Sequence, residues 1–230
     1  MMSIHGWASK GKWQNELTIS LNRNHILSAP YNYGFRFFRA SPWHIGRLVR
    51  KFRDWYFLTV DSQELGLQIT DPLNRPSIMV HSLGTWIVAR AIQKYPKIKF
   101  DKIFLFGSII PSDFDWYNLI INDQVNSIIY EKANSDGVVP WSFIFTGSFN
   151  PSSKKGFSQE SPFVEPVMVT KFGHSDFQYS ERFKTYIQQR LYKEPHLLSI
   201  KRGRDLNHEQ IKEYFKETLR IDLFENPQFI

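Results

Sequence analysis

The chain has 230 residues, of which 42% are hydrophobic and 16% aromatic, and it carries a formal net charge of +7. This length and apolar content predict one globular domain with a sizeable core, and they exclude a disordered chain. No apolar run approaches the ~20 residues of a membrane span, and no secretory leader is visible. The absence of cysteine excludes disulfides and cysteine-based zinc or redox sites, and it fits a cytoplasmic protein, which is our expectation.

The positive charge is scattered along the chain, with denser spots at residues 36–39, 47–53 and 201–204. None of these spots belongs to a recognisable nucleic-acid-binding motif, so we expect no nucleic acid partner and favour a solvated face for each. The excess of positive charge leaves an anionic membrane surface open as a partner. Nothing in the sequence indicates the oligomeric state.

Short apolar segments alternate with longer stretches of helical periodicity, which predicts an α/β fold with a mostly parallel sheet. Strands are expected over residues 2–4, 25–29, 77–81, 102–106, 125–130 and 166–171. Helices are expected over residues 12–20, 42–57, 83–95, 175–192 and 207–219.

Two domain-level expectations accompany these elements. Residues 1–192 form the main domain, and residues 193–230 form a C-terminal helical extension packed on it. Residues 30–41 and 141–165 have irregular sequences, and both follow predicted strands. They should therefore lie at the carboxyl edge of the sheet, where ligands bind in open α/β folds, and they are the candidates for a lid.

The most informative segment runs from Pro76 to Ala91. A short apolar stretch leads into His-Ser-Leu-Gly, and an amphipathic helical pattern follows at once, which is typical of a strand, a sharp turn carrying a nucleophilic serine, and a helix. Such a tight turn needs small residues two positions before and after Ser82. Gly84 meets this demand, whereas Val80 departs from the G-x-S-x-G pattern.

A serine hydroxyl is a poor nucleophile until a base removes its proton, so a nucleophilic Ser82 needs a base and an acid that orients the base. His174 lies beside Gly173, between the last predicted strand of the main domain and a helix, where a general base is expected. Asp136 follows a predicted strand and would orient the imidazole and stabilise its positive form. Asp113 and Asp115, just after the preceding strand, remain alternative acids.

These motifs, taken in this order, resemble the α/β-hydrolase superfamily, specifically its small lipase-like or esterase-like members, over roughly residues 2–192. The resemblance rests on four segments: His5-Gly6-Trp7, Val80-His81-Ser82-Leu83-Gly84, Asp136-Gly137-Val138-Val139-Pro140 and Gly173-His174. It implies a three-layer α/β sandwich, with a mostly parallel sheet reduced to about six strands and flanked by helices. It also implies that no metal or organic cofactor is needed.

The resemblance further implies a serine hydrolase that cleaves a carboxylic ester or thioester through an acyl-enzyme. Ser82 would attack, His174 would carry the proton and Asp136 would orient it. The backbone amides of Trp7 and Leu83 would hold the oxyanion, and donors of this kind typically contribute about 3 kcal/mol each. The aromatic content and basic balance favour a small-molecule or acyl-lipid ester as substrate. The alternative is a catalytically inactive ligand-binding or scaffold protein, because fold does not imply function.

Overall fold

The computed structural model describes residues 1–6, 12–23, 26–33, 42–61, 74–133, 136–137, 143–148, 150–159, 163–169 and 173–174. Several sequence predictions lie outside these residues, namely Trp7, the helices over 175–192 and 207–219, and the extension over 193–230. Within the part of the chain that is described, no helix has the length and apolar character needed to cross a membrane.

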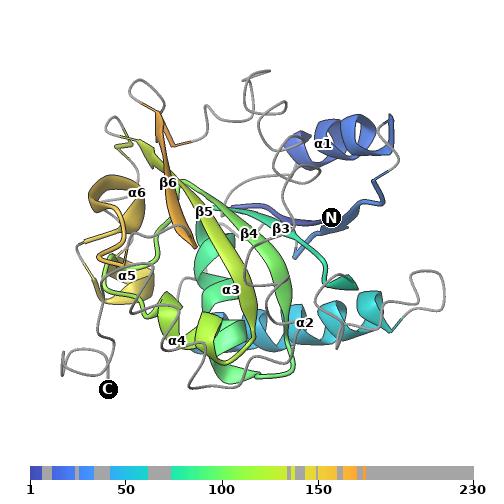
Figure 1. Cartoon of the computed structure of the whole chain (residues 1–230), viewed down its shortest axis with the longest axis horizontal. Coiled ribbons are helices and arrows are strands. Elements are labelled where there is room, and N and C mark those ends of the chain that lie inside the picture. Colours follow the sequence, from blue (N-terminus) through green and yellow to red (C-terminus); the bar gives the residue numbers. More distant parts are fainter. Residues whose placement is uncertain are drawn as a thin grey trace.

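The described strands form one six-stranded sheet in which every neighbouring pair runs parallel (Figure 1). In chain order they are β1 (Met2–Ile4), β2 (Ala29–Tyr31), β3 (Ile78–His81), β4 (Phe100–Phe106), β5 (Val125–Ala133) and β6 (Val164–Val169). Their order across the sheet is β2-β1-β3-β4-β5-β6. Because all strands point the same way, their carboxyl ends meet at one edge, and the loops that follow them share that edge.

One strand is displaced from its predicted position. The strand expected over residues 25–29 lies at Ala29–Tyr31, where it pairs with β1. The backbone amide of Ile26 donates to the carbonyl of Leu21, and the amide of Ala29 donates to the carbonyl of Met1. The apolar residues before Ala29 therefore belong to the connection, and the pairing with β1 decides where the strand begins.

The helices are α1 (Lys12–Arg23), α2 (Pro42–Val60), α3 (Leu83–Lys94), α4 (Trp116–Ile121), α5 (Phe143–Thr146) and α6 (Ser152–Lys155). The first three were predicted, and the three short ones were not. Around α6, the amide of Ser152 donates to the carbonyl of Ile110, and the Ser152 and Ser108 hydroxyls are 2.8 Å apart. This part of the 141–165 segment is therefore packed on the loop after β4.

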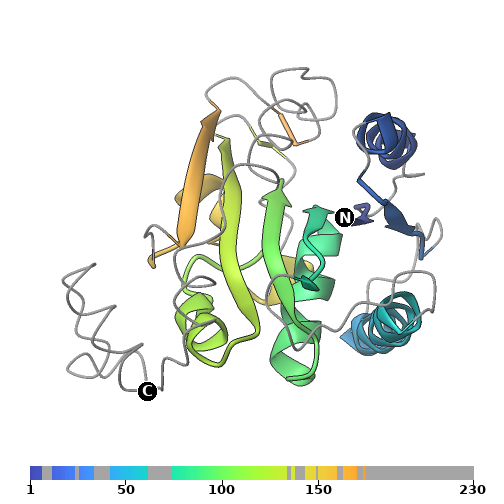
Figure 2. The same ribbon diagram turned by 45° about the vertical axis from the view of Figure 1, so that its right-hand side comes forward.

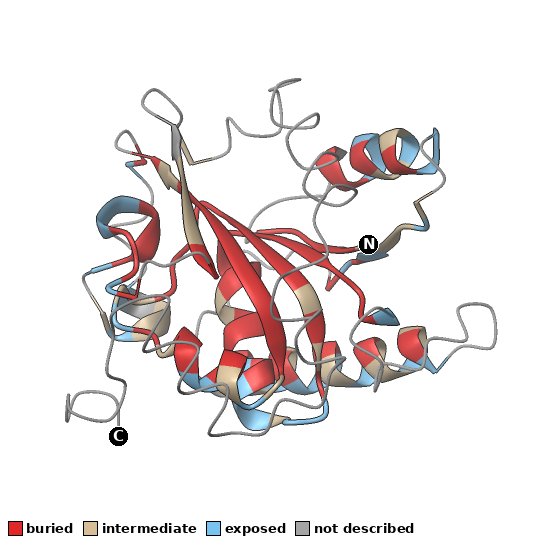
Figure 3. Ribbon diagram, viewed as in Figure 1, coloured by how far each residue is buried: buried red, intermediate tan, exposed pale blue. Residues whose placement is uncertain are grey.

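Two hydrophobic clusters lie on the two faces of the sheet, because side chains alternate along a strand. Ile103 and Leu105 of β4 join the larger cluster, which includes residues of α2, α3 and α4. Phe104 and Phe106 join the smaller cluster, together with α1 residues such as Trp13. The four inner strands β1, β3, β4 and β5 are buried along most of their length, and the edge strands β2 and β6 are less buried (Figure 3). Helices α1 and α2 lie on opposite sides of the sheet's β2 edge (Figure 2). The molecule is thus a three-layer α/β sandwich.

Candidate active site

Ser82 occupies the turn between β3 and α3, and its backbone is in an unfavourable conformation. Its φ is 52° and its ψ is −124°, a positive φ that residues with a side chain rarely adopt. The turn is held by hydrogen bonds on both sides. The Ser82 amide donates to the carbonyl of Phe106, and the Ser82 carbonyl accepts from the amide and the hydroxyl of Thr85. The fold thus fixes the serine at the carboxyl edge of the sheet.

Two glycines let the end of β1 approach this turn closely. A Cβ atom on Gly84 would lie 2.9 Å from the carbonyl oxygen of His5, and a Cβ on Gly6 would lie 2.7 Å from the Cβ of Ser82. The structure therefore confirms that position 84 needs a residue without a side chain. Val80, the departure from the sequence pattern, is a fully buried residue of β3 in the larger hydrophobic cluster.

Ser82, His174 and Asp136 form a continuous chain of hydrogen bonds. The distance from Ser82 Oγ to His174 Nε2 is 2.7 Å, and the distance from His174 Nδ1 to Asp136 Oδ2 is 2.8 Å. An ionised carboxylate can only accept, so Nδ1 carries the proton and Nε2 accepts from the serine hydroxyl. Asp136 is fully buried, which places its negative charge beside the imidazole in a poorly solvated environment.

The alternative acids lie elsewhere in the structure. Asp115 is the N-cap of α4, where its carboxylate accepts from the amide of Asn118 and from the side-chain amide of Gln159. Asp113 is an exposed residue two positions earlier. Both ring nitrogens of His174 are already bonded to Ser82 and Asp136, so the structure brings Asp136 to the imidazole.

Gly107 is a site residue that the sequence analysis did not single out. It follows β4 with φ +49°, and a Cβ there would lie 2.9 Å from the ring atoms Cε1 and Nδ1 and from the backbone oxygen of His174. The imidazole therefore packs directly on the backbone of Gly107. The sequence did offer a signal for it, namely its position directly after a predicted strand. A glycine there indicates a sharp change of chain direction or a close approach of another segment.

The end of β1 is held by aromatic and polar contacts from the residues after β2. The ring of Tyr33 stacks on the ring of His5 at 4.3 Å, and the Tyr33 hydroxyl donates to the His5 carbonyl. Burial raises the pKa of Tyr33, so the phenol keeps its proton and remains a donor. These contacts fix the start of the loop that contains Trp7, which itself lies outside the described residues.

Leu83, the other predicted oxyanion donor, is the first residue of α3. The first amides of a helix have no partner within the helix, and they carry the positive end of its dipole. The amide of Leu83 therefore belongs to the set that can bind a developing negative charge next to Ser82. The predicted site residues Ser82, Asp136, His174 and Leu83 all lie at the carboxyl edge of the sheet.

Neither any protein-family model nor any curated protein matches the sequence, but solved structures resemble the fold. An uncharacterized protein from Bacillus cereus has a TM-score of 0.56 at 14% identity, over 83% of this chain and 58% of that one. An α/β hydrolase from a lagoon-sediment metagenome has a TM-score of 0.51 at 15% identity, over 83% and 89%. An esterase from a Rhodococcus species has a TM-score of 0.51 at 10% identity, over 84% and 90%.

These likenesses concern the fold. The chain spans less than two-thirds of the length of the Bacillus protein and most of the length of the other two. Together with the strand order and the parallel six-stranded sheet, they give this chain the α/β-hydrolase fold. The fold class that the sequence predicted is thereby confirmed.

Proposed function

We propose that the protein is a serine hydrolase that cleaves a carboxylic ester or thioester. The observation that carries this proposal is the chain of hydrogen bonds from the Ser82 hydroxyl through the His174 imidazole to the Asp136 carboxylate, at 2.7 and 2.8 Å. A serine bonded to an unprotonated ring nitrogen, on a strained turn at a helix N-terminus, is arranged for nucleophilic attack.

In the proposed reaction, Ser82 Oγ attacks the carbonyl carbon while His174 Nε2 takes the hydroxyl proton. The buried carboxylate of Asp136 stabilises the imidazolium that forms. The oxyanion of the tetrahedral intermediate lies at the N-terminus of α3, where the amide of Leu83 donates to it, with the amide of Trp7 proposed as the second donor. Collapse of the intermediate expels the alcohol or thiol, which takes its proton from Nε2. The acyl group is now bound to Ser82 as an ester. A water molecule attacks this ester while His174 Nε2 takes its proton, and collapse of the second intermediate returns the proton to Ser82 and releases the carboxylic acid.

We also propose a small-molecule or acyl-lipid ester as substrate. The chain's 16% aromatic content and net charge of +7 favour an acyl lipid, including one presented at an anionic membrane surface. The fold that it shares with an esterase is compatible with ester chemistry. A chain-length series of esters tests this part, since a fixed preference for short water-soluble esters would count against an acyl-lipid substrate.

Labelling with a fluorophosphonate, followed by mass spectrometry to locate the adduct, tests the central proposal. The expected adduct is on Ser82, and it should be lost in Ser82→Ala and strongly reduced in His174→Ala. Ser82→Ala should lower ester turnover by about 10⁶-fold, as removal of a catalytic serine does. Ser158→Ala, which removes an exposed hydroxyl, serves as the control. Retained turnover in Ser82→Ala would overturn the proposal, and a folded protein without any adduct would favour the non-catalytic alternative.

A further inference from the structure

His81 directly precedes Ser82, yet the proposed reaction gives it no role. It is the last residue of β3 and its exposed fraction is only 4%. Its Nε2 donates to the backbone carbonyl of His174 at 2.8 Å, and the two imidazole rings are 4.9 Å apart. The turn that carries the serine is therefore joined to the loop that carries the base by a second hydrogen bond, through the main chain of His174.

Close packing fixes both ends of this bond. A Cβ on Gly6 would lie 2.9 Å from His81 Nδ1, so the ring of His81 rests against the backbone after β1. A Cβ on Gly107 would lie 2.9 Å from the same His174 carbonyl oxygen that accepts from His81. The carbonyl is thus held between the ring of His81 and the backbone of Gly107, and it has little room to move.

The charge state of His81 suits a fixed donor. Burial, reinforced by the neighbouring His174 ring, lowers the pKa of His81 to about 3, against the weaker opposing effects of the hydrogen bond to the His174 carbonyl and of Asp136. The ring is therefore neutral at ordinary pH. It supplies one N–H without placing a positive charge beside an imidazole that must itself become positive during the reaction.

We propose that His81 is a positioning residue whose Nε2–H fixes the backbone of His174, so that one imidazole reaches both Ser82 and Asp136. A ring that must satisfy two short hydrogen bonds at once tolerates little displacement. An error of 1 Å in such an arrangement can cost about 100-fold in rate. The effect on rate rests on the proposed function, whereas the effect on the position of the imidazole does not.

The competing explanation is that His81 only fills space in the core. Glutamine and methionine separate the two explanations, because their side chains are similar in length and volume but only glutamine carries an N–H. The amide nitrogen of glutamine can take the place of histidine Nε2, so His81→Gln should keep the hydrogen bond to the His174 carbonyl and His81→Met should lose it.

The experiment compares wild type, His81→Gln and His81→Met by kcat, KM, fluorophosphonate labelling rate and the low-field proton resonance of His174 Nδ1–H. In His81→Met we expect kcat and the labelling rate to fall about 10- to 100-fold with little change in KM, and the resonance to be lost or shifted. His81→Gln should recover most of the rate and the resonance. Equal losses in both variants, or wild-type behaviour in His81→Met, would overturn the inference.

Two further comparisons keep this result separate from other failures. If the wild-type protein neither reacts with the probe nor hydrolyses an ester, the proposed function fails. The resonance still decides the role of His81, which is supported if only His81→Met loses it and refuted if all three proteins keep it. If His81→Met does not fold, His81→Asn replaces it, because its shorter amide stops near the position of Nδ1 and should behave as the non-donor.

Discussion

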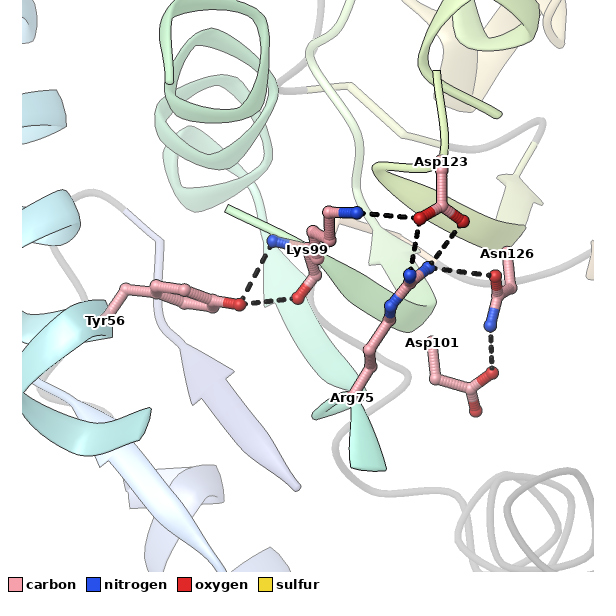
Figure 4. A network of polar contacts seen from close by, with 6 residues as sticks. All are labelled: Tyr56, Arg75, Lys99, Asp101, Asp123 and Asn126. Carbon is pink, nitrogen blue, oxygen red and sulfur yellow. Dashed lines mark hydrogen bonds and ion pairs between the residues drawn. The ribbon is translucent and has the colours of Figure 1, made fainter. Parts of the chain in front are cut away.

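The polar groups at the two edges of the sheet are arranged in different ways. At the carboxyl edge, Ser82, His174 and Asp136 form a linear chain that ends in a serine hydroxyl. At the amino edge, the guanidinium of Arg75 makes two hydrogen bonds to the carboxylate of Asp123, at 2.6 and 3.0 Å (Figure 4). The first arrangement ends in the hydroxyl that we propose as the nucleophile, and the second consists of ion pairs and hydrogen bonds that join neighbouring elements.

The amino-edge network shows how completely such groups can be paired. Lys99 Nζ contacts Asp123 at 2.7 Å, and the Tyr56 hydroxyl both donates to the carbonyl and accepts from the amide of Lys99 (Figure 4). Burial raises the pKa of Tyr56 to about 12, so it keeps its proton and joins α2 to the start of β4. The comparison teaches that the polar groups at the amino edge stabilise the fold, whereas those at the carboxyl edge surround a strained turn and carry the proposed reaction.

The largest loss of unfolding free energy should come from Asp123→Asn, which acts at the amino edge. The side chain of Arg75 is fully buried, so removing the charge of its Asp123 partner takes away a counter-charge from a buried cation and should cost about 3 kcal/mol of unfolding free energy. Asparagine tolerates the left-handed φ of 60° at this position, so the backbone should not add to the loss. Urea unfolding measures the change, and kcat should stay at the wild-type value because the site lies at the other edge.

Asp113→Asn is the matched control, since Asp113 is exposed. It should change neither stability nor turnover. A loss of turnover in Asp123→Asn without a loss of stability would contradict the conclusion that the amino edge serves stability and not turnover. A loss of turnover in Asp113→Asn would count against Asp136 as the acid.

A smaller effect should appear as a dependence of stability on pH that arises at the carboxyl edge. The pKa of His81 is about 3 in the folded protein and 6.5 in an unperturbed chain. Between these values the unfolded state binds a proton that the folded state does not, so stability falls as the pH falls below about 6.5. The slope from this one group is at most about 1.4 kcal/mol per pH unit.

Urea unfolding from neutral to mildly acidic pH measures this slope. His81→Gln should flatten the curve, while Asp123→Asn should leave this slope in place, and identical slopes in wild type and His81→Gln would contradict this origin.

The smallest effect concerns the strained turn itself. Glycine is usually less favourable than alanine because it loses more backbone entropy on folding. At Ser82 this order should reverse, and Ser82→Gly should be more stable than Ser82→Ala by about 1 kcal/mol, because a φ of 52° combined with a ψ of −124° is costly for a residue with a Cβ. Thermal unfolding of the two variants measures the difference. The same pair of substitutions at Ser158, which has no positive φ, should show the usual order, and that order at Ser82 would mean that the turn stores no strain.

Much of the fold was predictable because its signals are local. The strand over residues 77–81, the turn at Ser82 and the helix that follows are encoded in one continuous segment. The residues Ser82, Asp136 and His174 could be proposed together because successive parallel strands bring their following loops to one edge. Sequence alone left Asp113, Asp115 and Asp136 as alternatives, since the choice depends on where the imidazole lies in space.

Other features depend on contacts between distant segments. The short helix α4 begins where the side-chain oxygen of Gln159 accepts from the amides of Trp116 and Tyr117, and no pattern within residues 116–121 records that distant partner. In the same way, β2 begins at Ala29 because its backbone meets that of Met1. The hydrogen bond from His81 to the His174 carbonyl, and the need for glycine at position 107, likewise exist only once His174, which follows β6, lies against the ends of β3 and β4.

The contacts at Gly6, Gly84 and Gly107 bear on any attempt to evolve this protein in the laboratory. A methyl group added at Gly6 would lie less than 3 Å from Ser82, one at Gly84 less than 3 Å from the His5 carbonyl, and one at Gly107 less than 3 Å from His174. A mutational library aimed at new substrates should therefore leave these three positions unchanged. Diversity is better placed at exposed positions of the loops that follow the strands. There a new side chain can alter what is recognised while the reacting atoms keep their spacing.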